Sequence, residues 1–210
     1  ANGLTENCPE DEERDSFKLP SYVAKMVENK WLGSKSKQGF YKKVVNDGKK
    51  EILTLDLKTM EYRTKAKANF PILAATKAVD DLAERTKMLF FAKDKAGEFF
   101  RKVFSGLFSY VSHRVPEISD EIYKVDDALK AGFGWELGPF ETWDVVGVEK
   151  AIAIMKEQGK TPAAWITKMV DSGVTSFYQI ENGVKKFYDQ NSGEYKVIPG
   201  TENLLFIDNL

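Results

Sequence analysis

The feature that most constrains this chain is the stretch of residues 131–144, which reads AGFGWELGPFETWD. Its three glycines and one proline interrupt helical periodicity, so we expect two helices to meet there. Upstream, Pro116 opens a segment with apolar residues three or four positions apart, and Gly132 is the glycine expected just past its end. Downstream, Gly138 and Pro139 predict a second helix start, because a proline at the first helical position wastes no hydrogen-bond donor.

The stretch also carries several large apolar side chains, namely Phe133, Trp135, Leu137, Phe140 and Trp143. Burying one aromatic side chain stabilises a fold by about 1.5–3 kcal/mol, so this surface is not expected to remain in water. We therefore predict a packed corner. We interpret Trp135, Phe140 and Trp143 as core residues, with a ligand-binding wall as the alternative.

Two glycine patterns resemble phosphate-binding loops but fail on spacing. The dinucleotide fingerprint is G-x-G-x-x-G after a strand, whereas Gly132, Gly134 and Gly138 place the third glycine one residue late and follow a predicted helix. Gly33 and Gly39 are separated by five residues rather than four, so the P-loop pattern fails as well. We predict no cofactor-binding residue at either place.

Composition narrows the class of protein. The chain has 210 residues, 42% of them hydrophobic, which is enough for a proper core. Its 31 basic and 32 acidic residues give a net charge of -1, so we expect neither nucleic acid nor membrane as a partner. Cys8 is the only cysteine, which excludes an internal disulfide or a cysteine zinc site and fits the cytoplasm. The acidic N-terminus does not resemble a signal peptide.

The first third of the chain predicts a short helix and a β-hairpin. The helix follows Pro20, and its apolar face is Tyr22, Val23, Met26 and Val27. A loop over residues 29–39 leads into the hairpin strands 40–45 and 51–55, which Asn46, Asp47 and Gly48 join.

The rest of the chain is predicted to be mainly helical. Residues 71–92 have a helical pattern, and Asp94 is expected to cap a long helix. Its wide apolar stripe, typical of a buried central helix, is Phe99, Phe100, Val103, Phe104, Leu107, Phe108 and Val111. Further helices are expected over 148–155 and after Thr161-Pro162, followed by a second hairpin with strands 184–189 and 195–198.

The two ends of the chain resemble each other. Lys25-Met26-Val27 matches Lys168-Met169-Val170, and Gly39 and Gly183 follow at nearly equal distances before a lysine-containing strand. We interpret this as an internal repeat. The first copy lacks the long helix and the glycine-proline corner, so we expect its opening part before residue 1. The apolar residues 204–207 hang from a finished unit, which suggests an excised fragment.

Few residues are candidates for chemistry. His113 is the only histidine, and we favour a solvated helix-end residue over a catalytic one. Four carboxylates crowd one predicted helix and are interpreted as a solvated face rather than as paired acids: Asp120, Glu121, Asp126 and Asp127. The loop lysines Lys30, Lys35 and Lys37 are candidates to hold an anion, with ordinary solvated lysines as the alternative.

Three segments resemble the motifs of one known family. WELGPFETWDVVGVEK, residues 135–150, is similar to that family's GPF-x-x-x-D-x-x-G-[LV]-[DE] signature. RVPEISDEIYKVDDALKAGFG leads into it as in the long multifunctional bacterial and archaeal members. NKWLGSKSKQGFYKK, residues 29–43, is similar to the WLG-x-K-x-x-x-GFY stretch that closes the first copy of the domain. The family that these segments resemble is the C-terminal domain of 3-hydroxyacyl-CoA dehydrogenases, and the resemblance covers nearly the whole chain.

The resemblance implies a mainly α fold, a helical module like the C-terminal domain of phosphogluconate dehydrogenase, duplicated and with short β-hairpins at the end of each copy. Residues 1–58 would close the first repeat, 59–200 would form the second, and 201–210 would link to a following domain. An NAD-binding Rossmann domain would precede the chain, and an enoyl-CoA hydratase domain is a candidate to follow it.

For function, the resemblance implies a parent enzyme that oxidises 3-hydroxyacyl-CoA to 3-oxoacyl-CoA with NAD in fatty-acid β-oxidation. The family's catalytic histidine and glutamate lie in the Rossmann domain, and His113 matches no functional position. We predict no catalytic, cofactor-binding or metal-binding residue here, and an isolated chain without activity. The chain would wall the acyl-CoA site, with Lys35 and Lys37 binding substrate, and provide a packing surface for a homodimer. The alternative is a stand-alone, non-catalytic helical interaction module.

Overall fold

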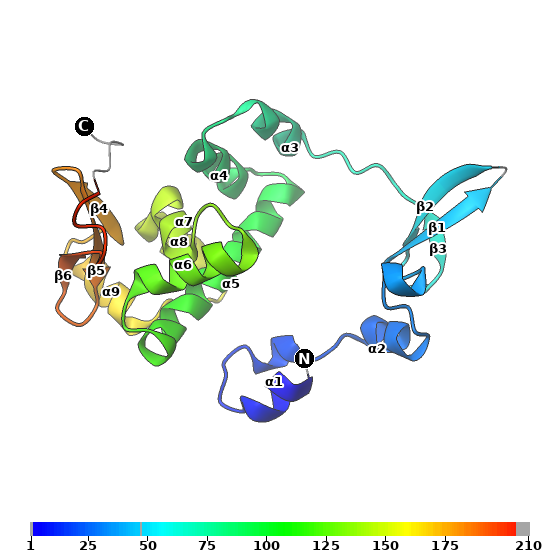
Figure 1. Cartoon of the computed structure of the whole chain (residues 1–210), viewed down its shortest axis with the longest axis horizontal. Helices are drawn as coiled ribbons and strands as arrows, with labels where there is room; N and C mark the ends of the chain where they lie inside the picture. Colours follow the sequence, from blue (N-terminus) through cyan, green and yellow to red (C-terminus); the bar gives the residue numbers. More distant parts are fainter. Residues whose placement is uncertain (1, 47, 205–210) are drawn as a thin grey trace. The chain divides into compact units, whose positions relative to one another are not determined.

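The structure of the chain, a computed structural model, describes residues 2–46 and 48–204 (Figure 1). The chain divides into two compact units between Asn69 and Phe70. Most of the regular structure is helical, and the sheets are small and antiparallel. The prediction of a mainly α fold with short hairpins is therefore confirmed. No helix among the described residues combines the length and apolar character needed to cross a bilayer.

The N-terminal unit contains short helices and one three-stranded sheet. Its elements are α1 (Asn2–Asn7), η1 (Arg14–Phe17), α2 (Ser21–Glu28), η2 (Ser34–Ser36), β1 (Tyr41–Asn46), β2 (Lys49–Leu55) and β3 (Tyr62–Thr64). The strands pair in the order β1-β2-β3, with Tyr41 opposite Thr54 and Leu55 opposite Tyr62. The predicted helix after Pro20 and the first hairpin are confirmed. Strand β3 was not predicted, and Asp47 of the predicted turn lies outside the described residues.

The N-terminal unit has a sparse core. Among the apolar side chains that the structure describes there, Met26 and Leu55 are buried. Large apolar residues of the hairpin, by contrast, are exposed. A small sheet needs a packed apolar face for independent stability, so this unit on its own has little hydrophobic stabilisation.

The C-terminal unit is a helical bundle that ends in a second sheet. Its elements are α3 (Pro71–Ala75), η3 (Thr76–Ala78), α4 (Leu82–Phe91), α5 (Lys95–Ile118), α6 (Ile122–Phe133), α7 (Pro139–Val146), α8 (Val148–Glu157), α9 (Ala164–Asp171), β4 (Tyr178–Glu181), β5 (Val184–Asp189) and β6 (Glu194–Val197). The predicted helical region 71–92 is divided into α3, η3 and α4. As predicted, Asp94 caps α5, and its carboxylate accepts the Gly97 N–H at 3.0 Å.

Helix α5 carries the centre of the core. Phe108 stacks on Trp143 of α7 with ring centroids 4.8 Å apart, and both side chains are fully buried. The predicted stripe is wrong at its N-terminal end, where Phe99 and Val103 are exposed. The first turns of α5 are covered on one side only, where Ala96 and Gly97 are buried. Phe99 and Val103 lie on the side that no other described element covers.

Pro116 does not begin a helix, which corrects the prediction. It lies in the last turn of α5, and the chain breaks at Ser119 before α6 begins. The proline lacks the N–H that would bond the Ser112 carbonyl one turn earlier. The indole N–H of Trp165 on α9 donates to that carbonyl instead, at 2.8 Å. The proline is tolerated because its lost donor is replaced from another helix.

The corner between α6 and α7 is only partly packed. Phe140 and Trp143 are fully buried, as predicted, but Phe133 and Trp135 are exposed, so the interpretation of Trp135 as core is wrong. Helix α6 runs one residue past Gly132, and the left-handed residue at its end is Gly134, with φ 67°. Phe133 is the last residue of α6 and Trp135 lies in the connection to α7, and both rings are at the surface.

The second sheet has the order β4-β5-β6 and repeats bonds of the first. The predicted hairpin of β5 and β6 is confirmed, and β4 was not predicted. Four hydrogen bonds form two matched pairs. In the first pair, the Leu55 N–H donates to the Phe40 carbonyl (2.9 Å) and the Tyr188 N–H donates to the Phe177 carbonyl (2.7 Å). In the second pair, the Tyr62 hydroxyl donates to the Gly39 carbonyl (2.7 Å) and the Tyr195 hydroxyl donates to the Ser176 carbonyl (2.6 Å).

Of the predicted apolar run 204–207, Leu204 is exposed and residues 205–207 lie outside the described residues, as do residues 205–210 of the predicted linker.

Candidate functional site

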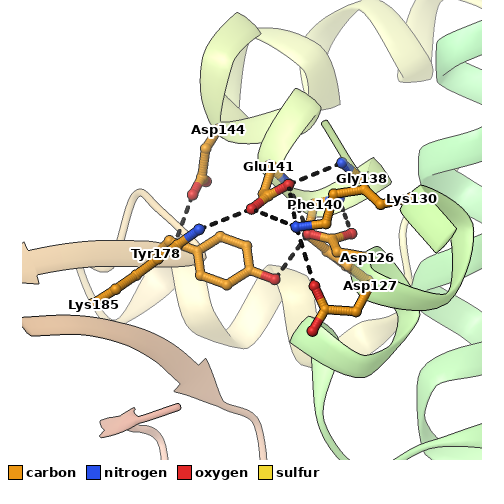
Figure 2. A network of polar contacts seen from close by, with 9 residues as sticks. All are labelled: Asp126, Asp127, Lys130, Gly138, Phe140, Glu141, Asp144, Tyr178 and Lys185. Atoms are coloured by element: carbon orange, nitrogen blue, oxygen red, sulfur yellow. Dashed lines mark hydrogen bonds and ion pairs between the residues drawn. The ribbon is translucent and has the colours of Figure 1, made fainter. Parts of the chain in front are cut away.

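The first candidate site is a buried carboxylate network between α6, α7 and β4 (Figure 2). Asp126 is fully buried, so its interpretation as part of a solvated face is wrong. One Asp126 oxygen accepts the Phe140 N–H at 2.9 Å. The other accepts the Glu141 N–H at 3.0 Å and the Tyr178 hydroxyl at 2.8 Å. Asp126 is buried because the first turn of α7 supplies backbone donors that have no helical partner of their own.

A glycine makes this close approach between helices feasible. A Cβ atom at Gly138 would lie 2.3 Å from the Asp126 Cβ, which no side chain tolerates. The Gly138 N–H donates to the Glu141 carboxylate at 3.0 Å, so the first turn of α7 is capped from within. Glu141 also binds Lys130 at 3.2 Å and Lys185 at 2.8 Å. The GPFE sequence therefore places an aromatic residue in the core and a carboxylate between two lysines.

Asp144, one turn further along α7, joins the helix to the second sheet. Its two oxygens accept the backbone N–H groups of Phe177 at 2.7 Å and of Tyr178 at 2.8 Å. Phe177 is fully buried against Phe140, with ring centroids 5.0 Å apart. The carboxylate thereby fixes where the chain enters β4.

The environment shifts the acidities of these groups. Burial raises the pKa of Asp126 to about 7 and that of Asp144 to about 7, although the hydrogen bonds that each carboxylate accepts act in the opposite direction. For Glu141, burial acts to raise the pKa, but the Gly138 N–H and the two lysines outweigh it and the pKa is lowered. Burial, followed by the charge of Asp126, raises the pKa of the Tyr178 hydroxyl.

The network is closed on itself. Donors of this chain occupy the oxygens of Asp126 and Asp144, and the Tyr178 hydroxyl is committed to Asp126. A catalytic acid needs an oxygen within reach of substrate, whereas perturbed pKa values also arise in structural networks. We interpret the network as a clasp that holds α6, α7 and β4 together.

The other residues singled out from the sequence are dispersed. His113 is half-buried, and its Nδ1 lies 2.8 Å from the Ser109 carbonyl of the same helix. Asp120 and Asp127 are exposed as predicted, while Glu121 is half-buried and paired with Lys124. In the described part of the chain, no three His, Cys, Asp or Glu side chains are grouped so as to hold a metal ion.

The second candidate site is the lysine loop, residues 33–38 of the N-terminal unit. The Gly33 N–H donates to the Gln38 carbonyl at 2.9 Å and closes the loop. The Ser36 hydroxyl oxygen accepts the Leu32 N–H at 2.9 Å and fastens the loop from inside. Lys35 and Lys37 are exposed on it, and Lys37 has a left-handed φ of 64°. The loop is therefore a closed turn that its own hydrogen bonds hold in place.

A hollow of about 650 Å³ opens beside this loop. Its lining is mostly apolar and consists of Gly33, Ser34, Lys37, Gly39, Phe40, Tyr41, Lys43, Val45 and Ile52. Of the predicted lysines, Lys37 reaches the hollow, whereas Lys30 and Lys35 do not line it. Lys43 was not singled out from the sequence, although the alternation of β1 places it on the same face as Tyr41.

The chain is similar to one known protein family and to several longer bacterial proteins. Residues 99–189 match the family described as 3-hydroxyacyl-CoA dehydrogenase, C-terminal domain. Over 95% of its length, the chain is 36% identical to a Bacillus subtilis protein named "Probable 3-hydroxyacyl-CoA dehydrogenase" and covers 24% of it. It is 27% and 28% identical to proteins of Rickettsia felis and Rickettsia prowazekii, each named "Putative fatty acid oxidation complex trifunctional enzyme".

The chain spans only a part of these relatives. The Rickettsia matches cover 63% and 56% of the chain and 17% and 15% of the respective relatives. No solved structure gives a significant match. The matches confirm the resemblance predicted from the sequence motifs.

Proposed function

Because residues 99–189 belong to the family of 3-hydroxyacyl-CoA dehydrogenase C-terminal domains, we propose that this chain is the helical C-terminal region of an NAD-dependent 3-hydroxyacyl-CoA dehydrogenase. The parent polypeptide oxidises 3-hydroxyacyl-CoA to 3-oxoacyl-CoA in fatty-acid β-oxidation, in the cytoplasm. The observation that carries this proposal is the similarity to a Bacillus subtilis relative over 95% of the chain. The relatives are several times longer, which leaves room for a Rossmann domain that binds NAD and for an enoyl-CoA hydratase domain.

Within the parent, this chain provides architecture rather than chemistry. The buried carboxylates are bonded to the chain itself, and the ring of His113 is bonded to its own helix. The proposed role is to wall the acyl-CoA site and to supply packing surface for the other domains or for a homodimer.

The proposed domain layout has a closing part of a first repeat, a second repeat and a linker, with boundaries near 58 and 200. The matched hydroxyl bonds of Tyr62 and Tyr195 support the repeat. Because Tyr62 completes the first sheet from β3, we extend the first repeat through Thr64.

Lys35 and Lys37 are proposed to contact the phosphates of coenzyme A. The observation in favour is that the lysine loop belongs to the first repeat alone: Phe40 follows Met26 by 14 residues, whereas Phe177 follows Met169 by 8. The six extra residues form the closed turn that presents both lysines to solvent. Neither ammonium pairs with a carboxylate among the described residues. Lysine acts on phosphate as a point charge, so each contact contributes modestly and weakens with salt.

The test is a Lys35→Ala, Lys37→Ala double variant of the longer polypeptide, assayed with 3-hydroxyacyl-CoA and NAD. We expect the Michaelis constant for the acyl-CoA to rise several-fold at low salt with turnover almost unchanged, the mark of lost uniform binding. Lys168→Ala is the matched control, because this exposed lysine lies on α9 in the second repeat. The 210-residue chain alone serves as the blank and is expected to be inactive.

An unchanged Michaelis constant at low salt would remove substrate binding from this chain and leave it purely architectural. The alternative function is a stand-alone helical interaction module. A reading frame that lacks a G-x-G-x-x-G strand-turn-helix would favour that alternative.

A further inference from the structure

In the C-terminal unit, helices cover the face of the second sheet that begins at Phe177. Phe177 is fully buried between Phe140 and Trp143, with ring centroids 5.0 and 5.2 Å away. The adjacent Tyr178 donates its hydroxyl to Asp126, and its N–H donates to Asp144. An aromatic start to the sheet is thus held by rings and carboxylates of α6 and α7.

In the N-terminal unit, the matching face is bare. We define the bare face as Phe40, Tyr41, Lys43, Val45 and Ile52. Its four apolar members are 48%, 58%, 62% and 57% exposed, in the order Phe40, Tyr41, Val45 and Ile52. The strand register places Tyr41, Lys43 and Val45 on one side of β1, with Ile52 opposite Lys43. A contiguous apolar surface of this kind on a folded unit marks an interaction site.

The residues around the bare face have the same local geometry as the equivalent residues of the second sheet, which helices cover. Tyr22 of α2 packs edge-on against Phe40 at 6.4 Å and 67°, and Trp165 of α9 packs against Phe177 at 6.1 Å and 68°. The Tyr62 hydroxyl bond repeats the Tyr195 one, as described above. The two sheets therefore present equivalent positions, and Phe40 and Tyr41 occupy the places of Phe177 and Tyr178.

The charges on the two faces also correspond. In the second sheet, Ile180 lies opposite Lys185, and the Lys185 ammonium binds Glu141 at 2.8 Å. In the first sheet, Lys43 lies opposite Ile52, so the lysine and the isoleucine have exchanged strands. Lys43 makes no ion pair with any residue that the structure describes. A carboxylate placed like Glu141 would meet Lys43.

We propose that the bare face receives a two-helix segment of the longer polypeptide built like α6 and α7. One carboxylate of this segment accepts the N–H groups of Phe40 and Tyr41, a second accepts the Tyr41 hydroxyl, and a third pairs with Lys43. An aromatic ring of the segment covers Phe40. The occupant is assigned to the same polypeptide because the relatives are several times longer than this chain. In that respect the inference rests on the proposed function.

Two other occupants fit the face less well. An acyl chain would fill the 650 Å³ hollow but offers no acceptor to the Tyr41 hydroxyl or partner to Lys43. A second copy of this chain has only one α6–α7 pair among its described elements, and Phe177 and Tyr178 of its own sheet occupy that pair. Lys35 does not line the hollow, so its proposed phosphate contact stays outside the proposed interface, whereas Lys37 lines the hollow itself.

The test compares amide hydrogen exchange of Phe40 and Tyr41 in the 210-residue chain and in the longer polypeptide. We expect exchange at these two amides to slow by roughly a hundredfold in the longer polypeptide, because buried, bonded amides exchange only on opening. The amides of Phe177 and Tyr178 are the internal reference and should exchange alike in both. In the longer polypeptide, Lys43→Glu should speed exchange at these two amides by about tenfold, which removes part of the protection. Lys49→Glu, on the other face of the hairpin, should leave their exchange rates unchanged.

Equal exchange of Phe40 and Tyr41 in both proteins would overturn the inference, because the face would then be bare in the whole protein. Protection that appears in the 210-residue chain and grows with its concentration would overturn it in favour of a second copy. Protection that acyl-CoA alone produces would overturn it in favour of a ligand. The readout is independent of catalysis, so an unchanged Michaelis constant in the lysine-loop variant would sink the substrate contact and leave this inference standing.

Discussion

Phe40 and Phe177 immediately precede equivalent strands and make the same kinds of local bond, yet Phe40 is 48% exposed and Phe177 is 0% exposed. The backbone geometry of the two sheets is therefore set locally, by turns, tyrosine hydroxyls and strand register. Burial is set by the helices that pack on the sheet, and among the described residues the N-terminal unit has no counterpart of α6 and α7 on its hairpin. A hairpin can have its native shape without having its native stability.

The largest expected effect is a contrast between truncations at the two matched phenylalanines. Phe177→Ala should destabilise the C-terminal unit by roughly 3–5 kcal/mol, because it leaves a cavity between Phe140 and Trp143. Phe40→Ala should destabilise the N-terminal unit by less than about 1 kcal/mol, because half of that ring is already in water. Calorimetric unfolding of the 210-residue chain measures both. Equal losses would mean that the face of Phe40 is covered within the chain.

A second difference should appear when pH is varied between 5 and 8. The pKa values of Asp126 and Asp144 are raised from 3.8 to about 7, so the folded C-terminal unit binds protons that the unfolded chain releases. Their contribution is fully present below about pH 4 and is lost as pH rises towards 7. The free energy of unfolding should fall with rising pH, on the order of 1 kcal/mol per pH unit. In the N-terminal unit, backbone hydrogen bonds from Lys58 and Thr59 lower the pKa of Asp56, so no loss is expected there in this range.

Denaturant unfolding at several pH values tests this difference, and Asp126→Asn provides the control. The variant keeps the shape of the side chain but removes one titrating group. The free energy of unfolding should therefore fall less steeply with pH, and the remaining pH dependence should come from Asp144. A C-terminal unit that gains stability between pH 5 and 8 would show that both carboxylates stay ionised in the fold.

The smallest expected effect is a loss of stability that should be equal in the two units. Tyr62→Phe and Tyr195→Phe each remove a hydroxyl that donates to a backbone carbonyl, at 2.7 and 2.6 Å. Each should cost its own unit about 1 kcal/mol, the usual net value of such a bond. Amide exchange of Leu55 and Tyr188 reports the two sheets separately. A loss confined to one unit would show that the sheets are held together differently, despite their matching bonds.

Local signals in the sequence were enough for much of the fold. Asp94 as a cap, Gly138-Pro139 as a helix start and the pairing of β1 with β2 each depend on a few neighbouring residues. The short strand β3 was missed because its three residues have no period of their own and pair only with the end of β2.

The network around Asp126 could not be predicted because its residues are far apart in the sequence. On its helix, Asp126 is one of several acids, and helical spacing alone does not reveal that Gly138 allows α7 to approach it. The signal available in the sequence was the combination of an aspartate, a later glycine-proline start and a tyrosine 52 residues downstream. Only tertiary packing brings these three together, whereas the lysine loop is a local turn and was placed correctly as a loop.

Pro116 and Trp165 also have a consequence for how such chains vary. The carbonyl of Ser112 has lost its helical donor and depends on an indole N–H from a residue 53 positions away. Replacing Trp165 by phenylalanine would keep the ring but strand that carbonyl, unless residue 116 also became a residue with an N–H. The effect of a substitution at position 165 therefore depends on which residue stands at position 116, and the reverse also holds. Neither effect can be assessed from one helix alone.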